Sequence, residues 1–130
     1  MKIAIIDDDP IFQFLVRKAI VKIAPAHELL RFDDGQQAFD YIKSCLPLNQ
    51  AALPELILLD INMPWMNGWQ FLDSYRALKA VNYHPHIYLV SSSSDPADLL
   101  KSQTYPELKG YLKKPLSIQQ MSDLFTALRD

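Results

Sequence analysis

The feature that most constrains the fold of this chain is the alternation of short apolar runs with segments of helical periodicity. Continuous apolar runs cover residues 3–6, 56–59 and 87–90, and runs of this length are typical of strands buried on both faces of a parallel sheet. Weaker strand candidates cover residues 27–32 and 108–113. Helical patterns lie between and after these runs, so the sequence predicts a strand–helix unit repeated five times.

The expected helices begin at recognisable capping signals. Asp9 and Asp95 are each followed by a proline, which is the arrangement of an N-cap residue before a proline in the first turn. The other candidate caps are Asp33 or Asp34, Asn67, and Ser117 with Gln120 at capping-box spacing. The apolar helix positions are Ile11, Leu15, Val16, Ala19, Ile20 and Ile23; Ala38, Tyr41, Ile42 and Cys45; Phe71, Leu72, Tyr75 and Leu78; Leu99 and Leu100; and Met121, Leu124, Phe125 and Leu128.

This alternation predicts an α/β fold with right-handed crossovers and helices on both faces of one sheet. Five strands in 130 residues fit the flavodoxin-like doubly wound (βα)5 arrangement, a five-stranded parallel sheet in the order 2-1-3-4-5. The length is that of one domain. Repeats, low-complexity tracts and Gly/Ser linkers are absent, so we expect a single domain over residues 1–130 with no output domain.

Composition and charge exclude several classes of function. The net charge of −2 argues against a general electrostatic attraction to nucleic acid. No apolar run approaches the roughly 20 residues of a membrane span, and the apolar stretch at the N-terminus is too short for a signal peptide. Cys45 is the only cysteine, so no intrachain disulfide can form. We therefore expect a cytoplasmic protein that binds neither nucleic acid nor membrane directly.

Polar and charged residues follow four of the expected strands, at the edge where doubly wound sheets bind ligands. They are Asp7, Asp8 and Asp9; Asp60; Ser91; and Lys113 and Lys114, which precede Pro115. Taken singly, each has an ordinary explanation, because an aspartate after a strand is usually a turn or cap residue, and Asp9 is interpreted in that way. Their combination at one edge of one sheet favours a functional site.

Elementary chemistry narrows what such a site can do. Carboxylates from adjacent strands repel each other and raise one another's pKa, and a hard divalent cation such as Mg²⁺ removes that penalty with oxygen ligands. Asp8, Asp60 and one backbone carbonyl, with waters, would suffice. A metal, a lysine, a hydroxyl and an accessible carboxylate together suit phosphoryl transfer, with Asp60 as the nucleophile that forms an aspartyl phosphate.

Four stretches carry a resemblance to a known family: "IAIIDDDP", "LILLDINMPWMNG", "IYLVSS" and "GYLKKP". Their order and spacing resemble those of response-regulator receiver domains of two-component signalling, in particular the stand-alone, chemotaxis-regulator-like type, over essentially all 130 residues. The resemblance implies a switch that accepts a phosphoryl group from a histidine kinase or phosphotransfer protein with Mg²⁺. It implies that the protein catalyses only its own phosphorylation and dephosphorylation. It also implies that a target protein binds at the face formed by the fourth and fifth strands and the helices that follow them.

The resemblance also implies a role for each matching position. The phosphoacceptor is Asp60, assisted by Ser91 and Lys114. The metal ligands are Asp8, Asp60 and the backbone carbonyl of Asn62, with Asp7 acting through water. The switch residues are Ser91 and Tyr111, and the Tyr111 ring is expected to be outward or mixed before phosphorylation and to prefer an inward position after it. The bond between Lys114 and Pro115 is expected to be cis.

The stretch "TYPELKGY" departs from the family, which commonly has a Gly-Ala pair before the last strand. Pro106 restricts the residue before it to non-helical conformations, so we expect a short fourth helix and an unusual loop.

Three other functions compete with the switch. A phosphorylation-independent interaction module of the same fold remains the alternative. A small-molecule aspartyl-phosphate hydrolase is disfavoured, because Asn62 stands where such enzymes need a second carboxylate. A cofactor-binding flavodoxin is disfavoured because no Gly-rich or Ser/Thr-rich phosphate loop follows the first strand.

Overall fold

Five strands alternate with five α-helices, as the apolar pattern predicts. The structure is a computed structural model that describes residues 1–127. The strands are β1 (Lys2–Ile6), β2 (Glu28–Phe32), β3 (Leu56–Leu59), β4 (His86–Ser91) and β5 (Leu108–Lys113). The helices are α1 (Pro10–Ile23), α2 (Gly35–Leu48), α3 (Gly68–Ala77), α4 (Pro96–Ser102) and α5 (Ile118–Ala127), with a short 3-10 helix at Gln50–Ala52. Leu128, expected in the last helix, lies outside the described residues.

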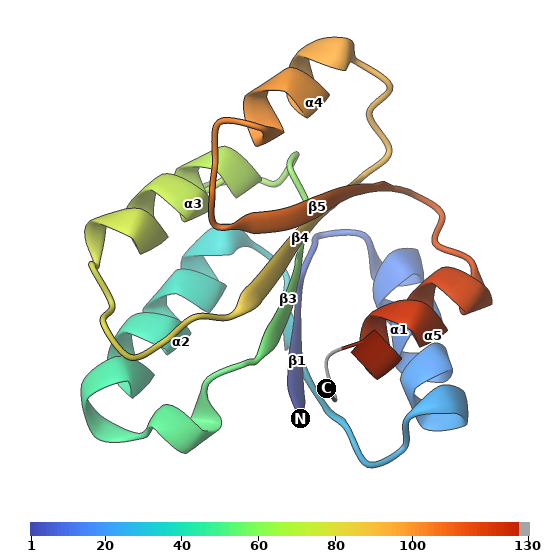
Figure 1. The fold of residues 1–130 in the computed structure, drawn as a ribbon, viewed down its shortest axis with the longest axis horizontal. Helices are drawn as coiled ribbons and strands as arrows, with labels where there is room; N and C mark the ends of the chain where they lie inside the picture. The colour runs from blue at the N-terminus through green and yellow to red at the C-terminus, as the bar shows by residue number, and fades with distance from the viewer. Residues whose placement is uncertain (128–130) are drawn as a thin grey trace.

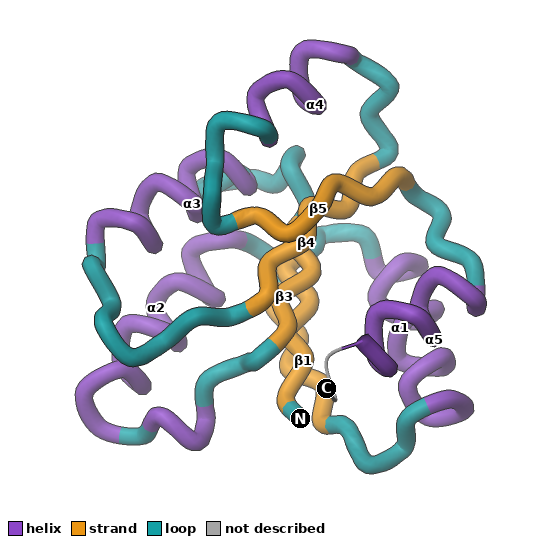
Figure 2. The backbone as a smooth tube through the Cα atoms, in the orientation of Figure 1, coloured by secondary structure: helices purple, strands orange, loops and turns teal. Residues whose placement is uncertain are grey.

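The strands form one parallel sheet in the order β2-β1-β3-β4-β5, which confirms the predicted doubly wound topology. Helices α1 and α5 cover one face and α2 and α3 cover the other, with α4 next to α3 at the β5 edge (Figures 1 and 2). The carboxyl ends of all five strands therefore lie at one edge of the sheet, and the loops that follow them meet there.

The core is divided by the sheet into two apolar clusters, and β3 supplies both. Leu56 and Leu58 pack with α1 and α5, whereas Ile57 and Leu59 pack with α2 and α3, because side chains alternate along a strand. All four residues are buried. This two-sided burial is the physical reason for the continuous apolar run. The edge strand β2 is only partly buried, which explains its weaker sequence signal.

The predicted caps are present at the start of the helices. Asp9 accepts a hydrogen bond from the Ile11 N–H at 3.0 Å, and Asp95 accepts one from the Ala97 N–H at 2.9 Å. Of the two candidates before α2, Asp34 is the cap. Capping boxes form at two further helix starts, between Asn67 and Gln70 and between Ser117 and Gln120.

Helix α4 is short, as expected, with seven residues. Backbone hydrogen bonds from Gln103, Thr104 and Tyr105 to carbonyls three residues earlier close it in tight turns. The chain then enters β5 at Leu108. None of the helices in the described part of the chain is long and apolar enough to cross a membrane.

Candidate functional site

Three carboxylates converge where β1 and β3 end. Ile6 is paired with Leu59 in the sheet, so the next residues, Asp7 and Asp60, emerge side by side. Asp7, Asp8 and Asp60 each offer an oxygen, and these oxygens lie within 4.8 Å of one another. Asp7 and Asp60 are 1% and 7% exposed, whereas Asp8 is exposed. The structure thus brings these three predicted residues together in one acidic cluster, and their roles stay a prediction.

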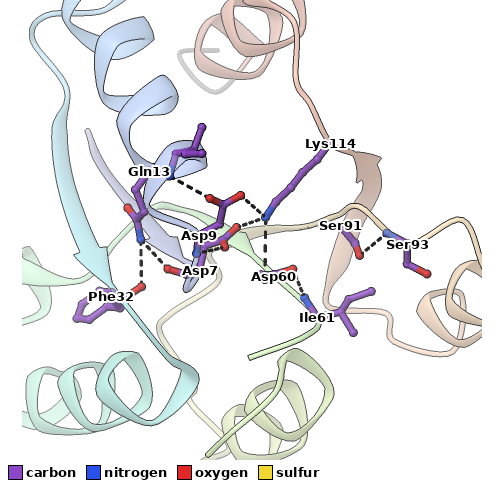
Figure 3. Close-up of polar contacts among 10 residues, drawn as sticks. Asp7, Asp9, Gln13, Phe32, Asp60, Ile61, Ser91, Ser93 and Lys114 are labelled. Carbon is purple, nitrogen blue, oxygen red and sulfur yellow. Dashed lines mark hydrogen bonds and ion pairs between the residues drawn. The ribbon is translucent and has the colours of Figure 1, made fainter. Parts of the chain in front are cut away.

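Lys114, the residue that follows β5, brings a positive charge to the carboxylates. Its ammonium lies 2.6 Å from Asp7 Oδ2, 3.9 Å from Asp9 Oδ2 and 4.0 Å from Asp60 Oδ2 (Figure 3). Its backbone N–H donates to the Ser91 carbonyl at 2.8 Å, and the Lys114–Pro115 bond is cis, as expected. The neighbouring Lys113 is exposed and donates to Ser94. Lys114 is therefore the lysine of the site.

Gln13 is a structural element of the site that the sequence patterns did not reveal. This buried α1 residue donates from Nε2 to the carbonyl of Asp7 at 3.0 Å and to that of Phe32 at 3.2 Å (Figure 3). It therefore ties the ends of β1 and β2 together beneath the carboxylates. Its signal in the sequence was a polar residue at a position that the helix turns toward the sheet.

The two buried carboxyl groups have perturbed pKa values. Burial, followed by the negative charge of Asp7, raises the pKa of Asp60 from 3.8 to about 7, although Lys114 and the Ile61 N–H act in the opposite direction. Burial also raises the pKa of Asp7, because it outweighs the ion pair with Lys114. One lysine thus offsets only part of the electrostatic cost of placing these groups together.

This donor set fits a hard divalent cation. The cluster offers only carboxylate oxygens, which Mg²⁺ prefers, and it carries more negative charge than Lys114 can balance. Both oxygens of Asp7 are engaged, since Oδ1 accepts the Asp9 N–H at 2.9 Å and Oδ2 faces Lys114. Asp8 is the exposed member. Asn62 is exposed in the loop after Asp60, between the buried Ile61 and Met63, and a metal-ligating role for its carbonyl stays a prediction.

Ser91 and Tyr111 lie on the same side of the sheet. Ser91 is fully buried at the end of β4, and its Oγ accepts the Ser93 N–H at 3.0 Å. Tyr111 is paired in register with Leu89 on β5. Because Leu89 belongs to the cluster beneath α2 and α3 and Tyr111 packs against that cluster, Ser91, two residues after Leu89, faces the same way.

The Tyr111 ring lies inward in this structure. Its hydroxyl is buried, with no hydrogen-bond partner among the described residues, and the ring packs on the core. We expected an outward or mixed position before phosphorylation. The dependence of the ring position on phosphorylation stays a prediction.

Residues 3–126 match the family model described as "Response regulator receiver domain". The chain is 25% identical to the probable methanogenesis regulatory protein FilR2 of Methanothrix harundinacea over 92% of its own length and 75% of that protein. It is 32% identical to the nitrate/nitrite response regulator NarL of Escherichia coli over 97% of its own length, and it spans 52% of NarL. A solved two-component response regulator from Legionella pneumophila superposes with a TM-score of 0.82 at 27% identity, covering 99% of this chain and 98% of the other.

The raised pKa of Asp60 predicts a pH-dependent stability. Because the folded-state pKa of about 7 lies above the ordinary 3.8, the folded protein binds a proton that the unfolded chain has lost. Its free energy of unfolding should fall as pH rises from about 4 to about 7 and then level off. Asp60→Asn removes this titration, so at pH 8 in chelator it should be more stable than the wild type by roughly 2–4 kcal/mol.

Urea unfolding at several pH values measures this difference. Asp40→Asn, which removes an exposed carboxylate on α2, is the control and should follow the wild type. Parallel curves for wild type and Asp60→Asn would contradict a raised pKa.

Proposed function

The chain belongs to the response regulator receiver domain family, and from this membership we propose that Asp60 is its phosphoacceptor. Receiver domains are the phosphorylation-controlled switches of two-component signalling, and they interact with histidine kinases or phosphotransfer proteins. They are signalling proteins rather than enzymes in the usual sense. The proposal concerns which residues of this chain perform the switch, and how.

The observation that carries the proposal is the environment of Asp60. A nearly buried carboxylate ends a central strand beside Asp7 and Asp8, within 4.0 Å of Lys114. A scaffold that only bound partners would gain nothing from this arrangement, because uncompensated buried carboxylates destabilise a fold. Phosphoryl transfer explains it, since the reaction needs a nucleophile and positive charge fixed around it.

The contacts of Asp60 distinguish its two oxygens. Oδ1 accepts the Ile61 N–H at 2.9 Å, whereas Oδ2 is the oxygen that faces Lys114. We assign the attack to Oδ2. The bond between Oδ2 and phosphorus forms as the bond from phosphorus to the donor histidine nitrogen breaks, and the imidazole leaves with the electron pair. Lys114 then shares its charge between Asp7 and the new phosphoryl oxygens.

Mg²⁺, when bound, would offset the charge of the carboxylates and of the phosphoryl oxygens. Asp8 and Asp60 would hold it directly. Asp7 would act through water, because its Oδ2 is closely paired with Lys114 at 2.6 Å, whereas Oδ2 of Asp60 lies 4.0 Å from the same ammonium. The backbone carbonyl of Asn62 would complete the protein ligands.

The acceptor assignment predicts a single site of modification. Acetyl phosphate with Mg²⁺ should add one phosphoryl group to the intact protein. Asp60→Asn should abolish the addition, because Asp7, the other buried carboxylate among the described residues, has both oxygens engaged by the Asp9 N–H and by Lys114. Intact mass spectrometry measures it. Full labelling of Asp60→Asn would refute the assignment.

The aspartates after β1 are predicted to differ in function. Asp8→Ala should weaken Mg²⁺ binding at least tenfold, because it removes a direct ligand. Asp9→Ala should weaken Mg²⁺ binding far less, but it should lower the free energy of unfolding by about 1 kcal/mol, since Asp9 caps α1. Titration calorimetry and urea unfolding measure the two effects. Equal losses of Mg²⁺ affinity would show that the roles are misassigned.

Output is proposed to pass from Ser91 to Tyr111. A phosphoryl group on Asp60 offers new acceptors to the Ser91 hydroxyl, and the movement of Ser91 would leave volume that the ring can fill. Burying part of a ring is worth a few kcal/mol at most, enough to shift a rotamer equilibrium. A target protein would sense this change at the face formed by β4, α4, β5 and α5.

This coupling predicts the behaviour of Ser91→Ala. The variant should still accept the phosphoryl group, because Asp60 and Lys114 remain. Beryllofluoride with Mg²⁺ should increase the inward population of the Tyr111 ring in the wild type but have little effect on it in the variant. NMR of the ring reports both states. Identical ring signals with and without beryllofluoride in the wild type would contradict the coupling.

A further inference from the structure

One side of α3 packs against α4 and against the connection between α4 and β5. Trp69, Asp73 and Arg76 are spaced four and three residues apart, so they share one side of the helix. The Tyr105 ring stacks on Trp69, with centroids 5.5 Å apart and planes inclined by 29°. The Lys101 ammonium, from α4, lies 4.9 Å from the centre of the Trp69 ring. Helix α4 and the α4–β5 connection therefore rest on α3 as well as on the sheet.

Polar contacts reinforce this packing. The Tyr105 hydroxyl donates to Asp73 Oδ1 at 2.8 Å. The Arg76 guanidinium donates to both carboxylate oxygens of Glu107, at 2.7 and 2.9 Å, and lies 5.0 Å from the centre of the Tyr105 ring. A two-bond guanidinium–carboxylate pair has a fixed orientation. These contacts define a latch formed by Trp69, Asp73 and Arg76 on α3 and by Lys101, Tyr105 and Glu107 opposite them.

The first residue of α3 is fixed at the site. The Gly68 N–H donates to the Ile61 carbonyl at 2.8 Å. A Cβ atom at Gly68 would lie 2.4 Å from the Asp60 carbonyl oxygen, so the helix starts against the backbone of Asp60 at a distance that only glycine allows. Helix α3 thus joins the backbone of the phosphoacceptor to the segment that leads into β5, the strand of Tyr111.

We propose that the latch holds α4 and the α4–β5 connection in the arrangement described and opposes their rearrangement on phosphorylation. This regulatory role rests on the proposed function of Asp60. Apart from the latch, α4 packs against β5 and is tied by the Ser93 hydroxyl, which donates to Asp98 at 2.6 Å. Release of the latch therefore removes the contacts of this segment with α3 and loosens the connection. The strength of the latch then determines how far phosphorylation of Asp60 shifts α4 and the α4–β5 connection toward the rearranged state.

Thermodynamic linkage makes this role measurable without a target protein. If the phosphorylated arrangement requires a loosened latch, then weakening the latch favours that arrangement, and the affinity for a phosphoryl mimic at Asp60 must rise by the same factor. Losing a surface pair of this kind changes an equilibrium by about two- to fivefold.

Two variants and one matched control test the latch. Glu107→Gln removes the charge of the Arg76 pair, and Tyr105→Leu removes the ring and its hydroxyl. Glu28→Gln breaks another surface ion pair, Lys2–Glu28 at 3.1 Å, on strands far from α4. Hydrogen exchange of residues 96–107 in the free proteins reports restraint. NMR titration with beryllofluoride and excess Mg²⁺ reports affinity, and urea unfolding confirms that each variant is folded.

Both latch variants should exchange faster at residues 96–107 and bind beryllofluoride about two- to fivefold more tightly, while Glu28→Gln matches the wild type in both measurements. Unchanged exchange in the folded variants would overturn the restraint. Faster exchange with unchanged or weaker beryllofluoride binding would overturn the regulatory role. Failure of the wild type itself to bind beryllofluoride would instead overturn the proposed function, and the exchange rates would still decide whether the latch restrains α4.

Discussion

The rest of the site depends on one constraint, the placement of two buried carboxylates, Asp7 and Asp60, side by side at the ends of two neighbouring strands. Both are nearly buried, and burial raises the pKa of each. Lys114 is the nearby cation that offsets their charge. The fold tolerates this unfavourable pair because the sheet and Gln13 fix the backbone beneath it. A ligand that brings positive charge, or a reaction that uses the carboxylate, relieves it.

The same geometry connects the site to more distant parts of the molecule. Asp60 is followed within eight residues by Gly68, where α3 begins against the Asp60 carbonyl. Ser91 is the last residue of β4, which lies between β3 and β5. The Ser91 carbonyl accepts the backbone N–H of Lys114. One connection runs along α3 from the backbone of Asp60 to the latch, and a second joins the end of β4 to the residue after β5 through Ser91 and Lys114. Both connections start at the carboxyl edge of the same hydrogen-bonded sheet.

Much of the fold was predictable because its signals are local. The run over residues 56–59 is apolar because both sheet faces bury it, and Asp9, Asn67, Asp95 and Ser117 cap helices through bonds that span two or three residues. The site was predictable for a related reason. In a parallel sheet, residues that end different strands must meet at one edge.

What the sequence determined by itself was the order of elements, their starting points, and the identity of the charged residues at the strand ends. Only the tertiary structure decided that Gln13 supports Asp7, that Asp60 presents Oδ2 to Lys114, that Tyr111 lies inward, and that Tyr105 and Glu107 fasten to α3. These contacts join segments distant in sequence, such as Arg76 and Glu107. No periodicity or spacing encodes them, because they depend on how helices pack once the sheet has formed.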